Sequence, residues 1–318
     1  MPIIKIAIIG SGKISEKYIA VIKKFKNLKI SAIVSKREKN CKKKAKNFRI
    51  PFYSTSIDYM MKTISPDIVI VCVTPSSTIK VCHKIFKYNC LTLIEKPIGL
   101  NLTEAKKIVN MAKFYNRNSF VALNRRFYSS TALLEKKILK FKKSKRVVHI
   151  IDQENTINAK KNGHDRETIK NWMFANSVHL IDYFKILCRG NIKNIRTKNY
   201  KIGKKQQFKL SIINFSSGDI GIYQAYWNRI ASWHVSVSSA NSFFYLSPIE
   251  TLYEKKFNGK ILRYNNTNVD KKFKPGFYLM IKNLIKQYKF GKSNLITLQK
   301  NLDTVKLIEK IYLKNYEK

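Results

Sequence analysis

Short apolar segments alternate with helical patterns over the first third of the chain. Apolar runs with the length of β-strands occur at 3–9, 29–34, 68–73, 91–95 and 119–123. The run IVIVCV at 68–73 is apolar throughout, as expected of a parallel strand covered on both faces. Helical patterns fall between these runs: to about residue 26, at 38–48, at 77–89, and from Thr103, a good N-cap with Glu104 in the first turn, to about 115. This alternation predicts βαβ units and a parallel sheet.

The pattern changes after about residue 123. A helical pattern at 128–142 leads into the strand candidate RVVHIIDQEN and, after a polar stretch, into a second helical pattern at 172–187. Weakly alternating β-like runs, which predict an antiparallel sheet, and two helical patterns complete the chain: strands at 208–215, 219–227, 233–239 and 242–248, helices at 276–289 and 296–313. We predict an α/β protein with a dinucleotide-type domain at 1–123 and an α+β domain at 124–318. The last helix is a candidate to pack back on the first domain.

Composition narrows the class of protein. The chain has 318 residues, of which 44% are hydrophobic, enough for a sizeable core in one large or two ordinary domains. It lacks a run of about 18 apolar residues, so we expect no transmembrane helix, and its N-terminus lacks a basic leader with a cleavage site. The cysteines are odd in number and lack CxxC spacing, which favours buried thiols in a reducing compartment, the cytoplasm, and no metal site. They are Cys41, Cys72, Cys82, Cys90 and Cys188.

The formal net charge of +44 invites a nucleic-acid interpretation. The excess is nearly all Lys, spread along the chain in pairs and triplets, whereas Arg would be expected at bidentate phosphate or base contacts. Abundant Lys, Asn and Ile together indicate an AT-rich coding bias at tolerant surface positions. We therefore expect no nucleic-acid partner, although a positive field raises encounter rates with anionic ligands.

The segment IIGSGKIS at 8–15 places two glycines between a strand and a helix. Gly10 would let the chain turn sharply, and Gly12 would let the backbone approach a pyrophosphate at the helix N-terminus, beside Lys13 and Ile14. Ser15 stands where the pattern has its third glycine and is small enough for close packing. At the start of a βαβ series, the segment predicts a dinucleotide site.

The end of the second strand bears on which dinucleotide fits. An acidic residue there would bind the ribose hydroxyls of NAD, but this chain has Ser35, Lys36 and Arg37. A hydroxyl followed by two cations can hold the 2′-phosphate of NADP. We therefore predict NADP, with NAD as the alternative.

Five segments, in this order, resemble the Gfo/Idh/MocA family, which includes glucose–fructose oxidoreductase and inositol dehydrogenase. They are IIGSGKIS at 8–15, VTPSS at 73–77, EKPIGLNLTEAKKI at 95–108, LNRRF at 123–127 and NSVHLIDYF at 176–184. The resemblance implies an N-terminal Rossmann domain and a C-terminal domain with an open, mostly antiparallel sheet, which is often a subunit interface. It implies an NAD(P)-dependent oxidoreductase acting on a sugar, a sugar derivative such as a nucleotide sugar, or a cyclitol.

The strand LTLIEKPIGL ends in an acid, a base and an imino acid. Lys96 follows the strand at the carboxyl edge of the sheet, where ligands bind in open α/β folds. A lysine whose pKa is lowered by burial and nearby cations can move a proton at neutral pH. The family resemblance implies that Lys96 is catalytic, and Glu95 either positions it or contacts the nicotinamide ribose. Pro97 ends the strand, and a cis Lys96–Pro97 bond is one way to aim the lysine.

A polar stripe marks the helical pattern at 172–187. Asn176, His179 and Tyr183 fall on one face at i, i+3 and i+7, among apolar neighbours, which suits a pocket wall or a satisfied core histidine. The resemblance implies that His179 hydrogen-bonds the reacting hydroxyl and shares acid/base work with Lys96. Asp182 matches a family position and either orients the site or completes the helix. Trp172 covers the cleft, stacks on a sugar face or packs in the core.

The resemblance also places LNRRF at the cleft. Without the resemblance, its two arginines would be interpreted as solvated surface charges. The expected cofactor-binding residues are Gly10, Gly12, Lys13, Ile14, Ser35, Lys36, Arg37, Thr74, Pro75, Ser76, Glu95, Lys96, Asn124 and Arg125. The expected substrate residues are Lys96, Arg125, Trp172, Asn176, His179 and Asp182.

The chain departs from the family pattern at two positions. Family members often carry Asp four residues before the histidine and His four residues after the proline of VTP; here these are Ala175 and Ile79. The departures leave open the substrate and the division of proton transfer. A catalytically silent, cofactor- or ligand-sensing relative is the alternative, and the retained Lys96 and His179 favour the enzyme. We also expect a homo-oligomer formed through the C-terminal sheet.

Overall fold

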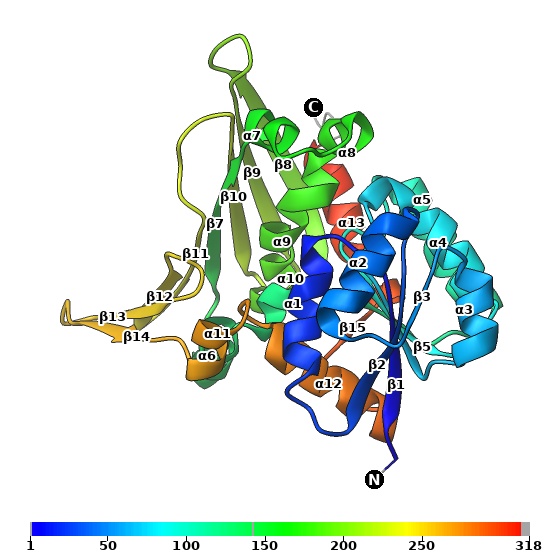
Figure 1. The fold of residues 1–318 in the computed structure, drawn as a ribbon. Coiled ribbons are helices and arrows are strands. Elements are labelled where there is room, and N and C mark those ends of the chain that lie inside the picture. The colour runs from blue at the N-terminus through cyan, green and yellow to red at the C-terminus, as the bar shows by residue number, and fades with distance from the viewer. Residues whose placement is uncertain (1, 142, 313–318) are drawn as a thin grey trace. The chain divides into compact units, whose positions relative to one another are not determined.

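The computed structural model describes residues 2–141 and 143–312, which divide into two compact units (Figure 1). The first unit combines the residues up to Asn124 with Lys272–Asp303. The second combines Arg125–Lys271 with the described residues from Thr304 onward. The division predicted from the sequence, 1–123 and 124–318, differs from this one because 272–303 return to the first unit.

A seven-stranded sheet forms the centre of the first unit, in the order β15-β6-β5-β4-β1-β2-β3. Its strands are parallel, except that β15 pairs antiparallel with β6. This arrangement confirms the predicted Rossmann-type sheet. The strands are β1 (Ile4–Ile9), β2 (Leu28–Val34), β3 (Phe52–Ser54), β4 (Ile68–Val71), β5 (Leu91–Glu95), β6 (Ser119–Ala122) and β15 (Ile296–Thr297).

Helices cover this sheet, with α3, α4 and α5 in one row and α1 beside α12 (Figure 1). The helix predicted with Thr103 as its N-cap has Asn101 as its cap instead, two residues earlier, and spans Leu102–Phe114. The Asn101 side chain accepts from the Glu104 N–H at 2.8 Å, and the Glu104 carboxylate accepts from the Leu100 N–H at 2.8 Å, so the two side chains satisfy free N–H groups at the helix start. The helices are α1 (Lys13–Ile22), α2 (Glu38–Phe48), α3 (Ile57–Ile64), η1 (Pro75–Ser77), α4 (Thr78–Ile85), α5 (Leu102–Phe114) and α12 (Phe277–Phe290).

An eight-stranded sheet forms the second unit, in the order β14-β13-β12-β11-β7-β10-β9-β8. Neighbouring strands are antiparallel apart from the parallel pair β7 and β10, which confirms the mostly antiparallel sheet that was expected. The strands are β7 (Val147–Glu154), β8 (Ile192–Lys201), β9 (Gln207–Phe215), β10 (Ile220–Trp227), β11 (His234–Ser239), β12 (Ser242–Leu246), β13 (Leu252–Lys256) and β14 (Ile261–Tyr264).

The helix predicted at 172–187 is divided into three parts. It begins with a π-helical turn, η4 (Met173–Ser177), and continues as α9 (Val178–Ile181) and α10 (Tyr183–Leu187). The other helices are η2 (Asn124–Phe127), α6 (Ser129–Ile138), η3 (Leu139–Phe141), α7 (Thr156–Lys161), α8 (Arg166–Lys170), α11 (Asn268–Lys272) and α13 (Leu298–Tyr312), which starts in the first unit and ends in the second. Within the described ranges, no helix is long and apolar enough to cross a membrane.

The two faces of the second sheet differ in burial. Along β7, Val148, Ile150, Asp152 and Glu154 are buried, while the residues between them are half-buried. The other face carries apolar side chains that remain exposed among the described residues, at Val147, Ile212, Ile220, Phe243 and Ile261. The alternation therefore yields one core face, which carries two acids, and one open apolar face.

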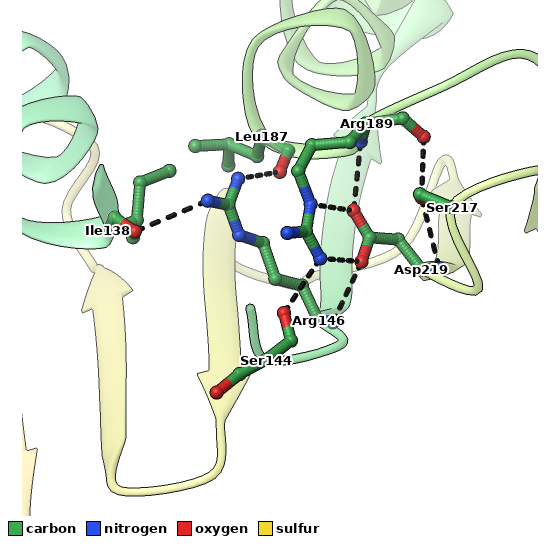
Figure 2. Close-up of polar contacts among 7 residues, drawn as sticks. All are labelled: Ile138, Ser144, Arg146, Leu187, Arg189, Ser217 and Asp219. Carbon is green, nitrogen blue, oxygen red and sulfur yellow. Dashed lines mark hydrogen bonds and ion pairs between the residues drawn. The ribbon is translucent and has the colours of Figure 1, made fainter. Parts of the chain in front are cut away.

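A buried carboxylate, Asp219, joins four segments of the second unit (Figure 2). It accepts the Arg146 N–H at 2.9 Å and three bonds from Arg189, through the backbone N–H at 2.9 Å, Nε at 3.0 Å and Nη2 at 2.6 Å. The Arg189 guanidinium also donates to the carbonyl of Ser144, and that of Arg146 donates to the carbonyls of Ile138 and Leu187. Burial raises the pKa of Asp219, but the hydrogen bonds from Arg189 outweigh it, so the pKa is lowered overall.

We expect Asp219→Asn to lower the free energy of unfolding by about 1–3 kcal/mol, because a neutral amide replaces the buried carboxylate that accepts hydrogen bonds from Arg146 and Arg189. Since the folded-state pKa of Asp219 is depressed, its contribution is fully present above about pH 4, the unfolded value, and is lost as pH falls through the folded pKa. Denaturant unfolding of both proteins from pH 7 to pH 2 should show the difference shrinking on acidification. Glu167→Gln, which removes an acid at an exposed position of the same unit, is the control. An equal loss of stability in both variants would contradict the assignment.

Candidate active site

The glycine turn follows β1 directly. Gly10 has φ +117°, and a Cβ built on it would lie 2.2 Å from the carbonyl oxygen of Cys72, the residue directly after the neighbouring strand β4. Both the backbone angle and the close approach require glycine. The Gly10 N–H donates to the Val34 carbonyl at 2.8 Å, which fixes the turn against the end of β2.

Gly12 caps the N-terminus of α1 and faces open space. A Cβ built on Gly12 would meet no described atom within 4 Å. Lys13 and Ile14 form the first turn of α1, and the fully buried Ser15 donates from Oγ to the Gly12 carbonyl at 2.6 Å. The third position of the glycine pattern is therefore filled by a small residue that fastens the turn. The open helix N-terminus can accommodate a phosphate.

The segments after β2 and β4 meet through their side chains. The Lys36 ammonium donates to Ser77 Oγ at 3.1 Å, and Ser77 Oγ lies 3.0 Å from Thr74 Oγ1. Ser35 Oγ donates to the Arg37 carbonyl, and Arg37 is an exposed residue at the N-cap of α2. Because β2 and β4 flank β1 in the sheet, these side chains lie on either side of the glycine turn.

Glu95 ends β5 and is tied to α1. It accepts a hydrogen bond of 2.5 Å from the hydroxyl of Tyr18, whose ring packs 4.8 Å from that of Phe277. Burial raises the pKa of Glu95, against the Tyr18 hydrogen bond and the charges of Lys96 and Lys274, and burial likewise raises the pKa of Tyr18. The helix that starts at the glycine turn thus also holds the EKP segment, in which Lys96 is half-buried and the Lys96–Pro97 bond is cis.

Asn124 is buried and donates from Nδ2 to the Pro275 carbonyl at 3.1 Å. It therefore fixes the returning segment 272–303 within the first unit. Of the other predicted cofactor residues, Thr74 and Ser76 are exposed and Pro75 is half-buried, all in the segment after β4.

The second unit contains His179, in α9, directly after the π-helical turn. Asn176 and His179 are half-buried, whereas Tyr183, predicted on the same face, is fully buried with its hydroxyl 2.8 Å from Thr131 Oγ1. The polar stripe is therefore shorter than predicted. Tyr183 lies in α10, after the break between α9 and α10, and its hydroxyl is directed to Thr131.

Glu154 on β7 anchors this turn. Its carboxylate accepts from Trp172 Nε1 at 2.5 Å, Asn176 Nδ2 at 2.9 Å and Ser177 Oγ at 2.6 Å. The indole N–H of Trp172 and the amide of Asn176, two predicted substrate residues, thus point to a buried acid. The three bonds hold the segment that leads into His179.

Asp152 lies beside Glu154 on the same face of β7 and accepts from the hydroxyl of Tyr223 at 2.7 Å. Burial raises the pKa of both carboxyls, and for Glu154 the charge of Asp152 raises it further. Neither acid was predicted from the sequence as part of the site. Their signal was present, because two acids at i and i+2 share a strand face with Val148 and Ile150, which predicts burial.

The two arginines of LNRRF have different surroundings within the second unit. Arg125 is buried with its guanidinium 4.2 Å over the ring of Trp233, and its Nη1 has no hydrogen-bond partner among the described residues. Arg126 makes two bonds to Asp182, at 2.6 and 2.8 Å, and Thr304 Oγ1 donates to the same carboxylate at 2.9 Å. Both oxygens of Asp182 are therefore occupied by protein donors.

Comparison with known proteins agrees with this geometry. Residues 4–123 match the family model GFO_IDH_MocA, described as an oxidoreductase family with an NAD-binding Rossmann fold. No curated protein matches the chain in sequence.

Solved structures resemble nearly the whole chain. A dehydrogenase from Chromobacterium violaceum has a TM-score of 0.85 at 14% identity, over 98% of this chain and 95% of that one. The WlbA dehydrogenase from the same organism, in complex with NADH and UDP-GlcNAcA, has a TM-score of 0.77 at 14% identity, over 98% and 94%. UDP-N-acetylglucosamine 3-dehydrogenase GnnA from Acidithiobacillus ferrooxidans has 0.77 at 12% identity, over 98% and 97%. At such identities the likeness is one of fold.

The family match and the glycine turn agree on the same residues, and they confirm the predicted resemblance and the predicted oxidoreductase class. Over residues 4–123, the chain is similar to the NAD-binding Rossmann domain of the Gfo/Idh/MocA oxidoreductase family.

Proposed function

We propose that the protein is a dehydrogenase or reductase that transfers hydride between a nicotinamide cofactor and a carbinol carbon of a carbohydrate-type substrate. The observation that carries the proposal is the link from Gly12 through α1 and Tyr18 to Glu95, which joins the dinucleotide turn to the EKP segment. The cofactor would supply the hydride chemistry, and the chain would orient the reactants and move the hydroxyl proton. The cytoplasm is the proposed location, since all five cysteines are free thiols, and cell fractionation would test it.

In this proposal Lys96 and His179 handle the hydroxyl proton. Lys96 follows β5 at the carboxyl edge of the first sheet, and Glu95, held by Tyr18, fixes the segment from which it projects. His179 is half-buried on a helix whose start is fastened by Glu154. Asp182 acts through Arg126 as a positioning residue, since its oxygens are already bonded.

The fold neighbours, the net charge and Arg125 bear on the class of substrate. Two proteins of the same fold are described with UDP-GlcNAcA or as acting on UDP-N-acetylglucosamine, so a nucleotide sugar is the leading candidate, ahead of free sugars and cyclitols. The net charge of +44 favours encounter with such an anion. Nη1 of the buried Arg125 has no hydrogen-bond partner among the residues that the structure describes, which supports a role for Arg125 in contacting the substrate or cofactor.

The alternative is a relative that binds cofactor or ligand as a sensor without turnover. It retains the dinucleotide turn but has no need for Lys96 and His179. Cofactor binding without turnover of any carbohydrate, with Lys96→Ala harmless in cells, would favour it.

Lys96→Ala tests the proposed chemistry. We expect kcat/KM to fall by about 10²–10⁴-fold, because the proton of the reacting hydroxyl loses its acceptor or donor. Cofactor affinity, measured by NADPH fluorescence titration, should remain close to that of the unaltered protein. Lys87→Ala, at an exposed lysine of the same unit, should keep full activity. Turnover near the original level in Lys96→Ala would contradict the mechanism.

We propose NADP as the preferred cofactor, with NAD as the alternative, because Arg37 is exposed beside the end of β2 and no acid stands there. Arg37→Asp should reverse or flatten the preference for NADPH over NADH in fluorescence titrations, since a carboxylate repels the 2′-phosphate and accepts ribose hydroxyls. Lys42→Asp makes the same charge change on an exposed position of α2 and should leave the preference intact. Tighter binding of NADH by the unaltered protein would reject the NADP assignment.

We also propose that the open face of the second sheet pairs with another copy of the chain. Exposed apolar side chains on one sheet face, including Ile212 at 41% and Phe243 at 37%, are the supporting observation. Ile212→Lys should lower the molar mass measured by light scattering toward that of the monomer. Ile230→Lys, at a position 97% exposed outside the strands, should not. A monomeric unaltered protein would remove the proposal.

A further inference from the structure

The second unit contains a buried cation, Lys209, that has no acidic partner in the described part of the chain. Lys209 on β9 is 7% exposed. Its ammonium donates to the amide oxygen of Asn199 and lies 4.9 Å from the centre of the Tyr312 ring. Within residues 2–141 and 143–312, no carboxylate lies within ion-pair distance of it. Burial lowers the pKa of Lys209 to about 8, so the ammonium is retained at neutral pH at a desolvation cost.

Asp152 lies on the same row of the sheet as Lys209, but its carboxyl already accepts a hydrogen bond from another side chain. Lys209 pairs with Ala225 on β10, and Ala225 pairs with Asp152 on β7, so Asp152 stands two strands away. Its carboxyl accepts from Tyr223, and burial raises its pKa. Asp152 therefore does not supply the missing counter-charge.

A cavity of about 310 Å³ opens against Lys209. Its wall combines aromatic rings, which offer flat apolar contact, with amides, which offer hydrogen bonds. They are Phe208, Trp227 and Tyr312, with Asn199 and Gln207. The size is at the lower end of that of small-molecule sites. None of these residues belongs to the predicted cofactor or substrate set.

The chemistry of the wall defines what would fill it. Burying an ammonium is costly unless it is paired, and a ligand anion would provide a pairing that the described residues do not give Lys209. The rings favour a flat or ring-shaped body of the ligand, and the amides favour hydroxyl groups on it. A carboxylate on a small ring can pair with the ammonium, pack against the aromatic rings and accept hydrogen bonds from the amides. A neutral ligand leaves the charge of the ammonium uncompensated.

We propose that this cavity is a binding site for a small ring-bearing carboxylate, whose acid group pairs with Lys209 and whose ring packs against Trp227 and Tyr312. The site is independent of the proposed oxidoreductase activity, so either can fail without the other. The ring can be aromatic or that of a sugar acid, and the test separates these two sources.

Ligand-observed ¹⁹F NMR with 4-fluorobenzoate tests the site on the full chain. We expect binding with a Kd of about 5 mM or tighter, and binding of 4-fluorobenzyl alcohol weaker by about tenfold, because the alcohol lacks the charge. This comparison uses the unaltered protein and does not depend on the folding of any variant. Displacement of 4-fluorobenzoate by glucuronate would identify the sugar-acid source, and failure of glucuronate to compete would identify the aryl-acid source.

Two variants test whether Lys209 supplies the positive charge that binds the carboxylate. Lys209→Gln should weaken 4-fluorobenzoate binding by about tenfold or more. Lys198→Gln removes the same charge from an exposed position of the adjacent strand outside the cavity and should leave binding unchanged. Equal affinity for acid and alcohol, equal loss in both variants, or no binding of either acid at about 20 mM would overturn the proposal.

Discussion

Parallel strands that pair in register end at a common edge, and the arrangement of the first unit depends on this constraint. Ile9 pairs with Val34 on one side and with Val71 on the other, and Val71 pairs with Ile94 on the next strand. The chain therefore leaves these four strands at neighbouring positions along one edge of the sheet. The glycine turn, the Ser35–Arg37 segment, the VTPSS segment and the EKP segment, which are scattered over about a third of the sequence, become neighbours as a result.

The strand β7 organises the second unit. Every second side chain along it is buried in the core. Two of these side chains are acids, and their burial is tolerated because each meets donors: Tyr223 for Asp152, and an indole, an amide and a hydroxyl for Glu154. Such a network orders the helix above it more strongly than apolar contact would, because each bond has a direction. The irregular turn η4 is the part of the helix that these bonds hold.

The sequence predicted those parts of the structure whose local signal agrees with their tertiary role. The inner strands of the first sheet are continuous apolar runs, so they were recognised, whereas the Lys- and Asn-rich edge strand β8 carries no such pattern and was missed. The short strands β3 and β15 depend on partners distant in sequence. The motifs of the first unit predicted the candidate site there. They did not predict Glu154, because the side chains that bond to it lie 18 to 23 residues away in the sequence.

The π-helical turn also changes how the missing aspartate should be regarded. Counting four residues back from His179 presumes an α-helix, and that count ends at Ala175, which is 4% exposed and faces the core. The half-buried positions that precede His179 are Met173 and Asn176. The half-buried residue of the turn nearest His179 is thus an amide bonded to Glu154, so the carboxylate that this turn engages comes from β7 and not from the helix itself.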